Sequence, residues 1–146
     1  MIEALSTHHN RVVTVVFPAI AAVLAAAAGI VGISDNPPGI LLAYGAAAAL
    51  VLAFVHPWRR SRQFRYLLYA SVLGLVVFAV VHNVFEVVAG RMDGPGFVVA
   101  VLQWIGVAAF LIAVLVCPPA IIIAVVGEVV MDIRNRHHPA RPDAAA

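Results

Sequence analysis

Residues 97–127 decide the fold, because they read FVVAVLQWIGVAAFLIAVLVCPPAIIIAVVG without one charged side chain. A helix needs about 20 mostly apolar residues to cross a bilayer. As one straight helix this run would measure about 46 Å, against a hydrocarbon core of about 30 Å. Pro118 and Pro119 lie inside it, and proline both removes a helical hydrogen bond and clashes with the preceding turn. We therefore expect a tilted fourth membrane helix over residues 96–133, kinked at 118–119.

Three more charge-free runs precede it, over residues 12–33, 39–55 and 66–85. The 146-residue chain is 64% hydrophobic and 11% charged, whereas about a quarter of a soluble domain is charged. Lipid must therefore cover much of its surface. The sequence predicts an all-α polytopic membrane protein with an antiparallel four-transmembrane-helix bundle. The expected domain is 1–133, with helices near 11–33, 38–56, 65–90 and 96–133, and a cytoplasmic tail over 134–146.

The connectors are short and rich in turn-forming residues. Ser34 to Gly39 reads SDNPPG, which places Asn36 at a helix N-cap and Pro37 at the first helical position. Pro57 should end the second helix, and a basic turn follows over residues 58–65. The glycine-rich GRMDGPG over residues 90–96 separates the third and fourth helices. Such short links make successive helices antiparallel neighbours.

The arginines predict the orientation, because cytoplasmic loops of membrane proteins are enriched in basic residues. Of the nine basic residues, all arginine, Arg91 alone falls on one side of the predicted membrane. We therefore expect a multi-pass protein of a prokaryotic plasma (inner) membrane, with both termini in the cytoplasm. The other side holds Arg11, Arg59, Arg60, Arg62, Arg65, Arg134, Arg136 and Arg141.

The first apolar run has an alternative interpretation as a signal peptide over residues 1–28, cleaved after Ala25-Ala26-Ala27. Its apolar stretch is longer than the usual roughly 7–15 residues, which favours a retained membrane helix. Cleavage would leave three spans in the same orientation.

Small residues recur four apart in the first three helices, a spacing that lets membrane helices approach closely. Such faces serve either the internal packing of the bundle or contact with another chain, and the uniform apolarity of the helices leaves both uses open. The pairs are Ala25/Gly29, Ala28/Gly32, Gly45/Ala49 and Ala70/Gly74.

One polar cluster lies within the third apolar helix, where ionisable side chains are costly and are candidates for function. His82 and Glu86 are four residues apart and share a helix face. They could form a proton- or cation-handling site, with Glu86 as the carboxylate and His82 as relay or metal ligand. Alternatively, Glu86 pairs with Arg91 at the membrane surface and the other side chains only join helices. The candidate intramembrane polar site comprises His82, Asn83, Glu86, Gln103, Asp35 and Arg91.

Histidine placement argues against a cofactor. His82 should lie about 24 Å from the end of the bundle that carries His56, so these two cannot ligate one haem iron. The remaining histidines fall in terminal segments as adjacent pairs. The single cysteine, Cys117, forms no zinc or redox motif and is expected to be a small apolar residue. We therefore predict no catalytic residues, no metal and no cofactor.

Opposite charges gather at the cytoplasmic ends of the helices. Glu128 and Asp132 lie four apart, facing the arginine-rich second connector, and we expect ion pairs that hold the fourth helix in place. The arginines are expected to contact anionic lipid headgroups. These inner-side charge contacts comprise Arg59, Arg60, Arg62, Arg65, Glu128 and Asp132.

Two function classes remain open. The short loops leave no room for a soluble catalytic site, which favours a non-enzymatic accessory or oligomeric interaction subunit. The alternative is a small proton- or cation-coupled transporter or channel that uses the His82, Asn83 and Glu86 cluster. Expected partners are the lipid bilayer and either a homo-oligomer or a larger membrane complex, with no role for nucleic acid.

Overall fold

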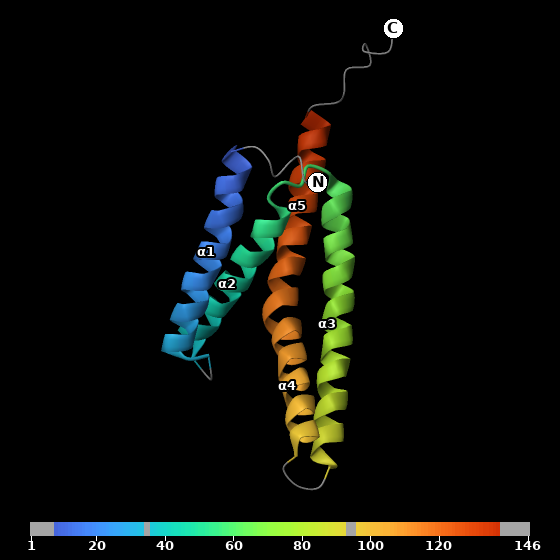
Figure 1. Ribbon diagram of the computed structural model, residues 1–146. Coiled ribbons are helices and arrows are strands. Elements are labelled where there is room, and N and C mark those ends of the chain that lie inside the picture. The colour runs from blue at the N-terminus through green and yellow to red at the C-terminus, as the bar shows by residue number, and fades with distance from the viewer. Residues whose placement is uncertain (1–7, 34–35, 93–95, 138–146) are drawn as a thin grey trace.

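The computed structural model describes residues 8–33, 36–92 and 96–137, and these residues form helices joined by short turns (Figure 1). The prediction of an all-α chain with four helices of membrane-spanning length is confirmed. In chain order the elements are α1 (His8–Val31), α2 (Pro37–Val55), α3 (Ser61–Gly90), α4 (Phe97–Leu111), the π-helical segment η2 (Ile112–Val116) and α5 (Cys117–His137).

The turn after α1 follows the predicted chemistry with one difference. Gly32 has φ +86°, a conformation that other residues rarely adopt, and its N–H donates to the Ala28 carbonyl at 2.9 Å. Asn36 is the N-cap of α2 and Pro37 its first residue, as expected. The Asn36 side chain, however, donates to the Val31 carbonyl at 2.9 Å and therefore caps the end of α1.

Helix α3 begins at Ser61, four residues before its expected start at residue 65. The Gln63 side-chain oxygen explains the earlier start, because it accepts the backbone N–H groups of Arg59 and Arg60, each at 3.2 Å. Donors that precede a helix need such an acceptor. Arg62 and Arg65 therefore project from the first turns of a helix, where the sequence had predicted a loop.

The fourth predicted span is one continuous helical stretch made of α4, η2 and α5 (Figure 1). The expected irregularity lies at residues 112–116, just before Pro118 and Pro119 rather than at them. Each proline ring blocks the carbonyl four residues earlier, and these carbonyls belong to Val114 and Leu115. The wider π turn accommodates that loss. At its other end α5 continues to His137, four residues beyond the expected boundary at residue 133.

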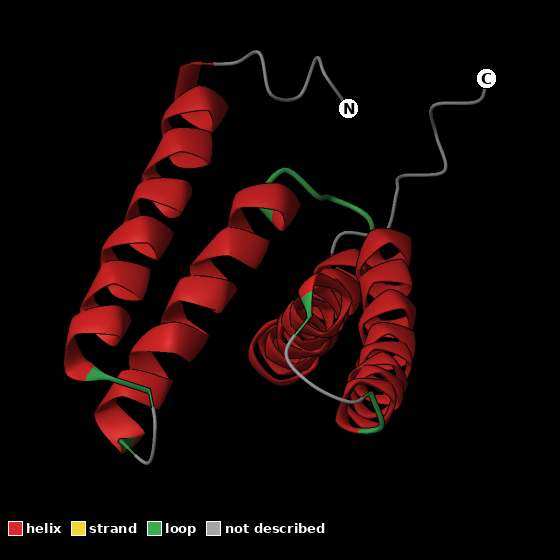
Figure 2. Cartoon of the chain, turned by 60° about the horizontal axis from the view of Figure 1, so that its bottom comes forward, coloured by secondary structure: helices red, strands yellow, loops and turns green. Residues whose placement is uncertain are grey.

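The four helices form two antiparallel hairpins. We call α1 and α2 the first hairpin, and α3 with α4, η2 and α5 the second. Within the described residues α1 packs on α2 alone, whereas α2 also contacts η2 and α5, and α3 contacts α4, η2 and α5. Figure 2 shows the two hairpins side by side. The bundle is therefore joined across its middle by α2 and remains open beside α1.

The core is made of small side chains and the surface of large apolar ones. Alanines dominate the buried residues, while many valines, leucines, isoleucines and aromatic rings are exposed. A water-soluble protein has the opposite distribution, and close packing of small residues is typical of membrane helices. This arrangement and four helices long and apolar enough to cross a bilayer identify a multi-pass membrane protein. The buried seam of the fourth span comprises Gly106, Ala109, Ala113, Cys117, Ala120 and Ala124.

The second hairpin is longer than the first. Helix α2 has 19 residues and α3 has 30, which correspond to about 28 Å and about 45 Å. The turn between α2 and α3 lies at one end of the molecule, which we call the arginine end. At the opposite end, the far end, the α3–α4 turn reaches beyond the α1–α2 turn (Figure 1). Helix α4, which forms this end together with the last turns of α3, makes no contact with the described residues of the first hairpin.

Candidate functional site

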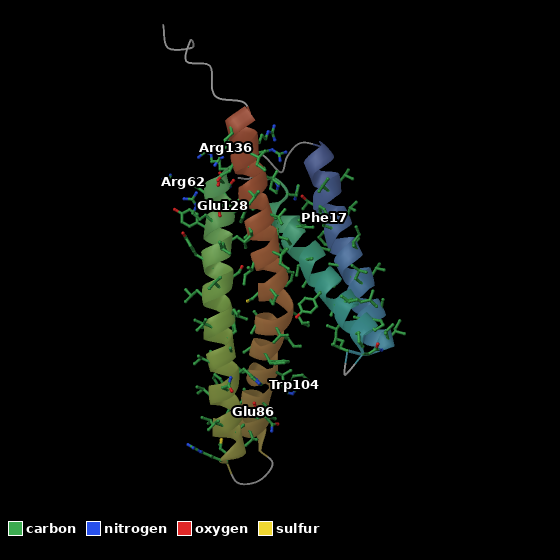
Figure 3. The ribbon with its side chains drawn as sticks, turned by 180° about the vertical axis from the view of Figure 1, so that it is seen from behind. Phe17, Arg62, Glu86, Trp104, Glu128 and Arg136 are labelled. Atoms are coloured by element: carbon green, nitrogen blue, oxygen red, sulfur yellow. The ribbon has the colours of Figure 1, made fainter. Side chains whose placement is uncertain are left out.

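His82 and Glu86 form a direct contact near the far end of α3. The His82 Nε2 atom lies 3.3 Å from a Glu86 carboxylate oxygen, as the four-residue spacing predicts. The two side chains differ in exposure, at 26% for His82 and 71% for Glu86. Figure 3 shows Glu86 at the far end, where Trp104 also lies. The pair thus joins a half-buried imidazole to an open carboxylate.

Helix α4 fixes the imidazole from the other side. His82 Nδ1 lies 3.0 Å from the Gly106 carbonyl oxygen, and a Cβ placed on Gly106 would lie 3.7 Å from the same nitrogen, an ordinary contact distance. The Phe110 ring packs against it with centroids 5.0 Å apart. A carbonyl only accepts hydrogen bonds, so Nδ1 must carry a proton. The His82 Nε2 atom is thereby held facing the Glu86 carboxylate.

A cleft of about 400 Å³ opens beside this pair. Gln103 of α4 borders it, so three of the six predicted polar residues lie around one space. The cleft is wide enough to admit water and small cations to this pair. Its lining comprises His82, Glu86, Ala89, Gly90, Gln103, Gly106 and Val107.

The other three predicted residues do not join this cleft. Asn83 is exposed and donates to the Ala79 carbonyl of its own helix at 2.7 Å. Arg91 is exposed at the end of α3 and forms no ion pair with Glu86, which contacts His82 instead. Asp35 lies outside the described residues. Within the described part of the chain, no three His, Cys, Asp or Glu side chains gather as a metal site.

The arginine end is organised by one ion pair between helices. Arg65 Nε of α3 donates to a Glu128 carboxylate oxygen of α5 at 2.9 Å. Figure 3 shows Glu128 near Arg62 and Arg136 at this end. Asp132 is exposed and forms no ion pair with another described residue. The prediction that acidic residues of the fourth span face the arginine-rich turn is met by Glu128 alone.

Three arginines of the turn border a second polar cleft, of about 600 Å³. The Trp58 ring meets the Phe64 ring edge-on at 5.5 Å and forms part of the floor of the turn. The charge pattern of the sequence places these arginines at a membrane surface but does not predict a cleft between them. Its lining comprises Pro57, Trp58, Arg59, Arg60, Arg62, Gln63 and Tyr66.

An apolar cleft of about 520 Å³ separates the first hairpin from the fourth span. Alanines of α1 and α2 line one side, and residues around η2 line the other. Ala25 borders this cleft, and a side chain built at Gly29 would meet no atom within 4 Å. Ala28, by contrast, is only 2% exposed. Which small pair would be covered could not be predicted from the sequence, because every face of α1 within the apolar run is apolar.

No family model matches the chain, and comparison with curated proteins and with solved structures finds no significant match.

Proposed function

We propose that the protein is a non-enzymatic subunit of a prokaryotic plasma membrane, with both termini in the cytoplasm, that acts by associating with other membrane helices. Its first partner in this proposal is a second copy of the same chain. The observation that carries the proposal is the open small-residue face of α1, which the rest of the chain leaves uncovered.

The uncovered face consists of the Ala25/Gly29 pair. α1 packs on α2 alone, and its buried Ala21 and Ala28 border the same cleft as the exposed Ala25. Two small residues four positions apart allow two membrane helices to pack at a shorter distance between their axes. A face that is the same on two copies is self-complementary about a two-fold axis, which is the commonest symmetry of homo-oligomers. The pair therefore supports a dimer through α1.

Counting photobleaching steps of single labelled molecules in liposomes tests this proposal. For the unaltered chain, the number of photobleaching steps per fluorescent spot should rise to two as the density of the chain in the membrane rises. Ala25→Leu should lower dimerisation about tenfold, because a bulky side chain separates the backbones. Ala19→Leu is the matched control, since Ala19 is also exposed but lies about 120° away around the helix.

A monomer at every density would contradict self-association. Affinity purification in mild detergent then separates the remaining cases. Suppose that a defined membrane protein copurifies with the unaltered chain and with Ala19→Leu but not with Ala25→Leu. The chain would then still be an interaction subunit, but its partner would be that protein and not a second copy. A lone monomer in both experiments would overturn the proposal.

A second candidate function is a small proton- or cation-coupled transporter or channel. The contact between His82 Nε2 and Glu86 favours it, because both groups can carry a proton and the contact opens onto a cleft that Gln103 also borders. In this alternative Glu86 exchanges the proton with the aqueous side and His82 passes it toward α4. A single four-helix chain offers little room for a pathway, so an oligomer would have to complete it.

Proton flux into liposomes that contain a trapped pH dye tests this alternative. Glu86→Gln should abolish the flux while the protein still inserts, and Glu128→Gln should leave it unchanged. Flux no faster than in empty liposomes would contradict a transport function.

A further inference from the structure

The cleft at the α2–α3 turn carries an inference that does not depend on the proposed function. Three arginines, Arg59, Arg60 and Arg62, line it together with the amide of Gln63. The cleft lies where two membrane-length helices end, so it faces the boundary between bilayer and water. Its volume of about 600 Å³ is sufficient for a group larger than a single ion.

The charge of these arginines is not neutralised within the described chain. Of the arginines at residues 59–65, Arg65 alone forms an ion pair with a described residue, Glu128, at 2.9 Å. Arg59, Arg60 and Arg62 form no ion pair with another described residue. Three neighbouring guanidinium groups repel one another, and an anion placed between them would relieve that repulsion. One guanidinium group can donate two parallel hydrogen bonds to two oxygens of the same phosphate. The arginines therefore favour phosphate over a single-atom anion.

The turn holds its shape without a ligand. The Gln63 side chain accepts the N–H groups of Arg59 and Arg60, and the Trp58 ring packs against Phe64. The N–H groups of Arg59 and Arg60 are thereby occupied, and the side chains of these arginines remain to bind a ligand. A binding site whose framework is already fixed loses less entropy when its ligand arrives.

An exposed apolar face runs from the cleft along α3. Arg62 is followed at helical spacing by Tyr66, Tyr69 and Leu73, which are 69%, 62% and 65% exposed. Tyrosines at this depth are typical of the membrane interface. A molecule with a phosphate at Arg62 and a hydrocarbon chain along this face would match both surfaces. A free phosphate would leave the apolar face unused.

We propose that the α2–α3 turn binds the headgroup of an anionic phospholipid from the adjacent leaflet, with its phosphate between Arg59, Arg60 and Arg62. One acyl chain lies along Tyr66, Tyr69 and Leu73. Basic pockets at the ends of membrane helices bind anionic lipids in this manner, and each arginine near the surface strengthens binding.

Native mass spectrometry of the delipidated full chain tests this inference. Phosphatidylglycerol should bind at least about tenfold more tightly than phosphatidylcholine with the same acyl chains. The double variant Arg59→Gln/Arg62→Gln should lose about tenfold in affinity for phosphatidylglycerol. The control Arg134→Gln/Arg136→Gln removes the same charge from the end of α5 and should change that affinity less than about twofold. Excess inorganic phosphate should leave the lipid bound.

Three results would overturn the site. They are equal affinity for the two lipids, equal loss in the two double variants, and full displacement by inorganic phosphate. Because arginine loss can disturb insertion, a second measurement uses the unaltered chain. A phosphatidylglycerol with a photoreactive group should crosslink to residues 57–73, and labelling spread evenly over all helices would also overturn the proposal.

Discussion

The two ends of the second hairpin hold α3 against the fourth span in different ways. At the arginine end, the Phe64 ring occupies the space where a side chain at Gly127 would begin, and Arg65 bonds to Glu128. At the far end, a Cβ placed on Gly106 would lie 3.7 Å from His82 Nδ1, which is an ordinary contact distance. The arginine end is tightly packed and the far end is loosely packed.

This difference separates two uses of glycine and of charge. Close packing against Phe64 requires glycine at position 127, whereas the contact of His82 with the Gly106 carbonyl leaves room for a Cβ at position 106. The ion pair at the arginine end joins two helices, whereas the His82–Glu86 contact lies within one helix and opens to a cleft. The arginine end therefore joins the two helices of the hairpin, and the far end leaves its polar pair beside an open cleft.

The largest expected effect is from Gly127→Ala. Its Cβ would overlap the Phe64 ring, so the ring or the helix must move, and we expect a loss of about 1–3 kcal/mol in the free energy of unfolding. Gly106→Ala is the matched change at the far end and should cost less than about 1 kcal/mol or stabilise slightly, because alanine favours helix. Reversible unfolding in mixed micelles measures both. Equal losses would show that the two ends are packed alike.

His82→Ala should have an intermediate effect. It removes the bond to the Gly106 carbonyl and the contact with Phe110, and we expect a loss of about 1 kcal/mol, since hydrogen bonds between membrane helices contribute modestly. Asn83→Ala is the control, because Asn83 bonds only to its own helix. The same unfolding assay compares them. A larger loss for Asn83→Ala would contradict the arrangement of the far end.

Arg65→Gln should have the smallest effect. Arg65 is 49% exposed and Glu128 24%, so solvent screens their attraction, and such pairs contribute at most about 1 kcal/mol. The loss should shrink further as salt is added. A salt-independent loss above about 2 kcal/mol would show that this ion pair is shielded from water.

The sequence was sufficient for the spans, the turns and the contact between His82 and Glu86. Charge-free runs mark membrane helices, proline and glycine mark the turns, and a four-residue spacing places two side chains on one helix face. The π-helical segment was anticipated only as an irregularity at Pro118 and Pro119, because their effect falls on carbonyls one turn earlier.

The sequence was not sufficient for the pairing of helices or for the covered faces. In a soluble helix the apolar side identifies the buried face, but lipid-facing and buried faces are both apolar here. The buried seam of the fourth span has a spacing of three and four residues between small side chains, as in Gly106, Ala109 and Ala113. That spacing was present in the sequence and could have predicted the face that meets α3.

The central claim is a four-span protein whose arginine end faces the cytoplasm, and cysteine accessibility tests it most directly. Cys117→Ala provides a background without cysteine, because the chain contains a single one. Single cysteines are then introduced as Asn36→Cys and Met92→Cys at one end, and as Arg59→Cys and Asn135→Cys at the other. In intact spheroplasts, a membrane-impermeant maleimide should label the first two variants alone, and the other two only after permeabilisation. Labelling of the Arg59→Cys or Asn135→Cys variant in intact spheroplasts would contradict the account.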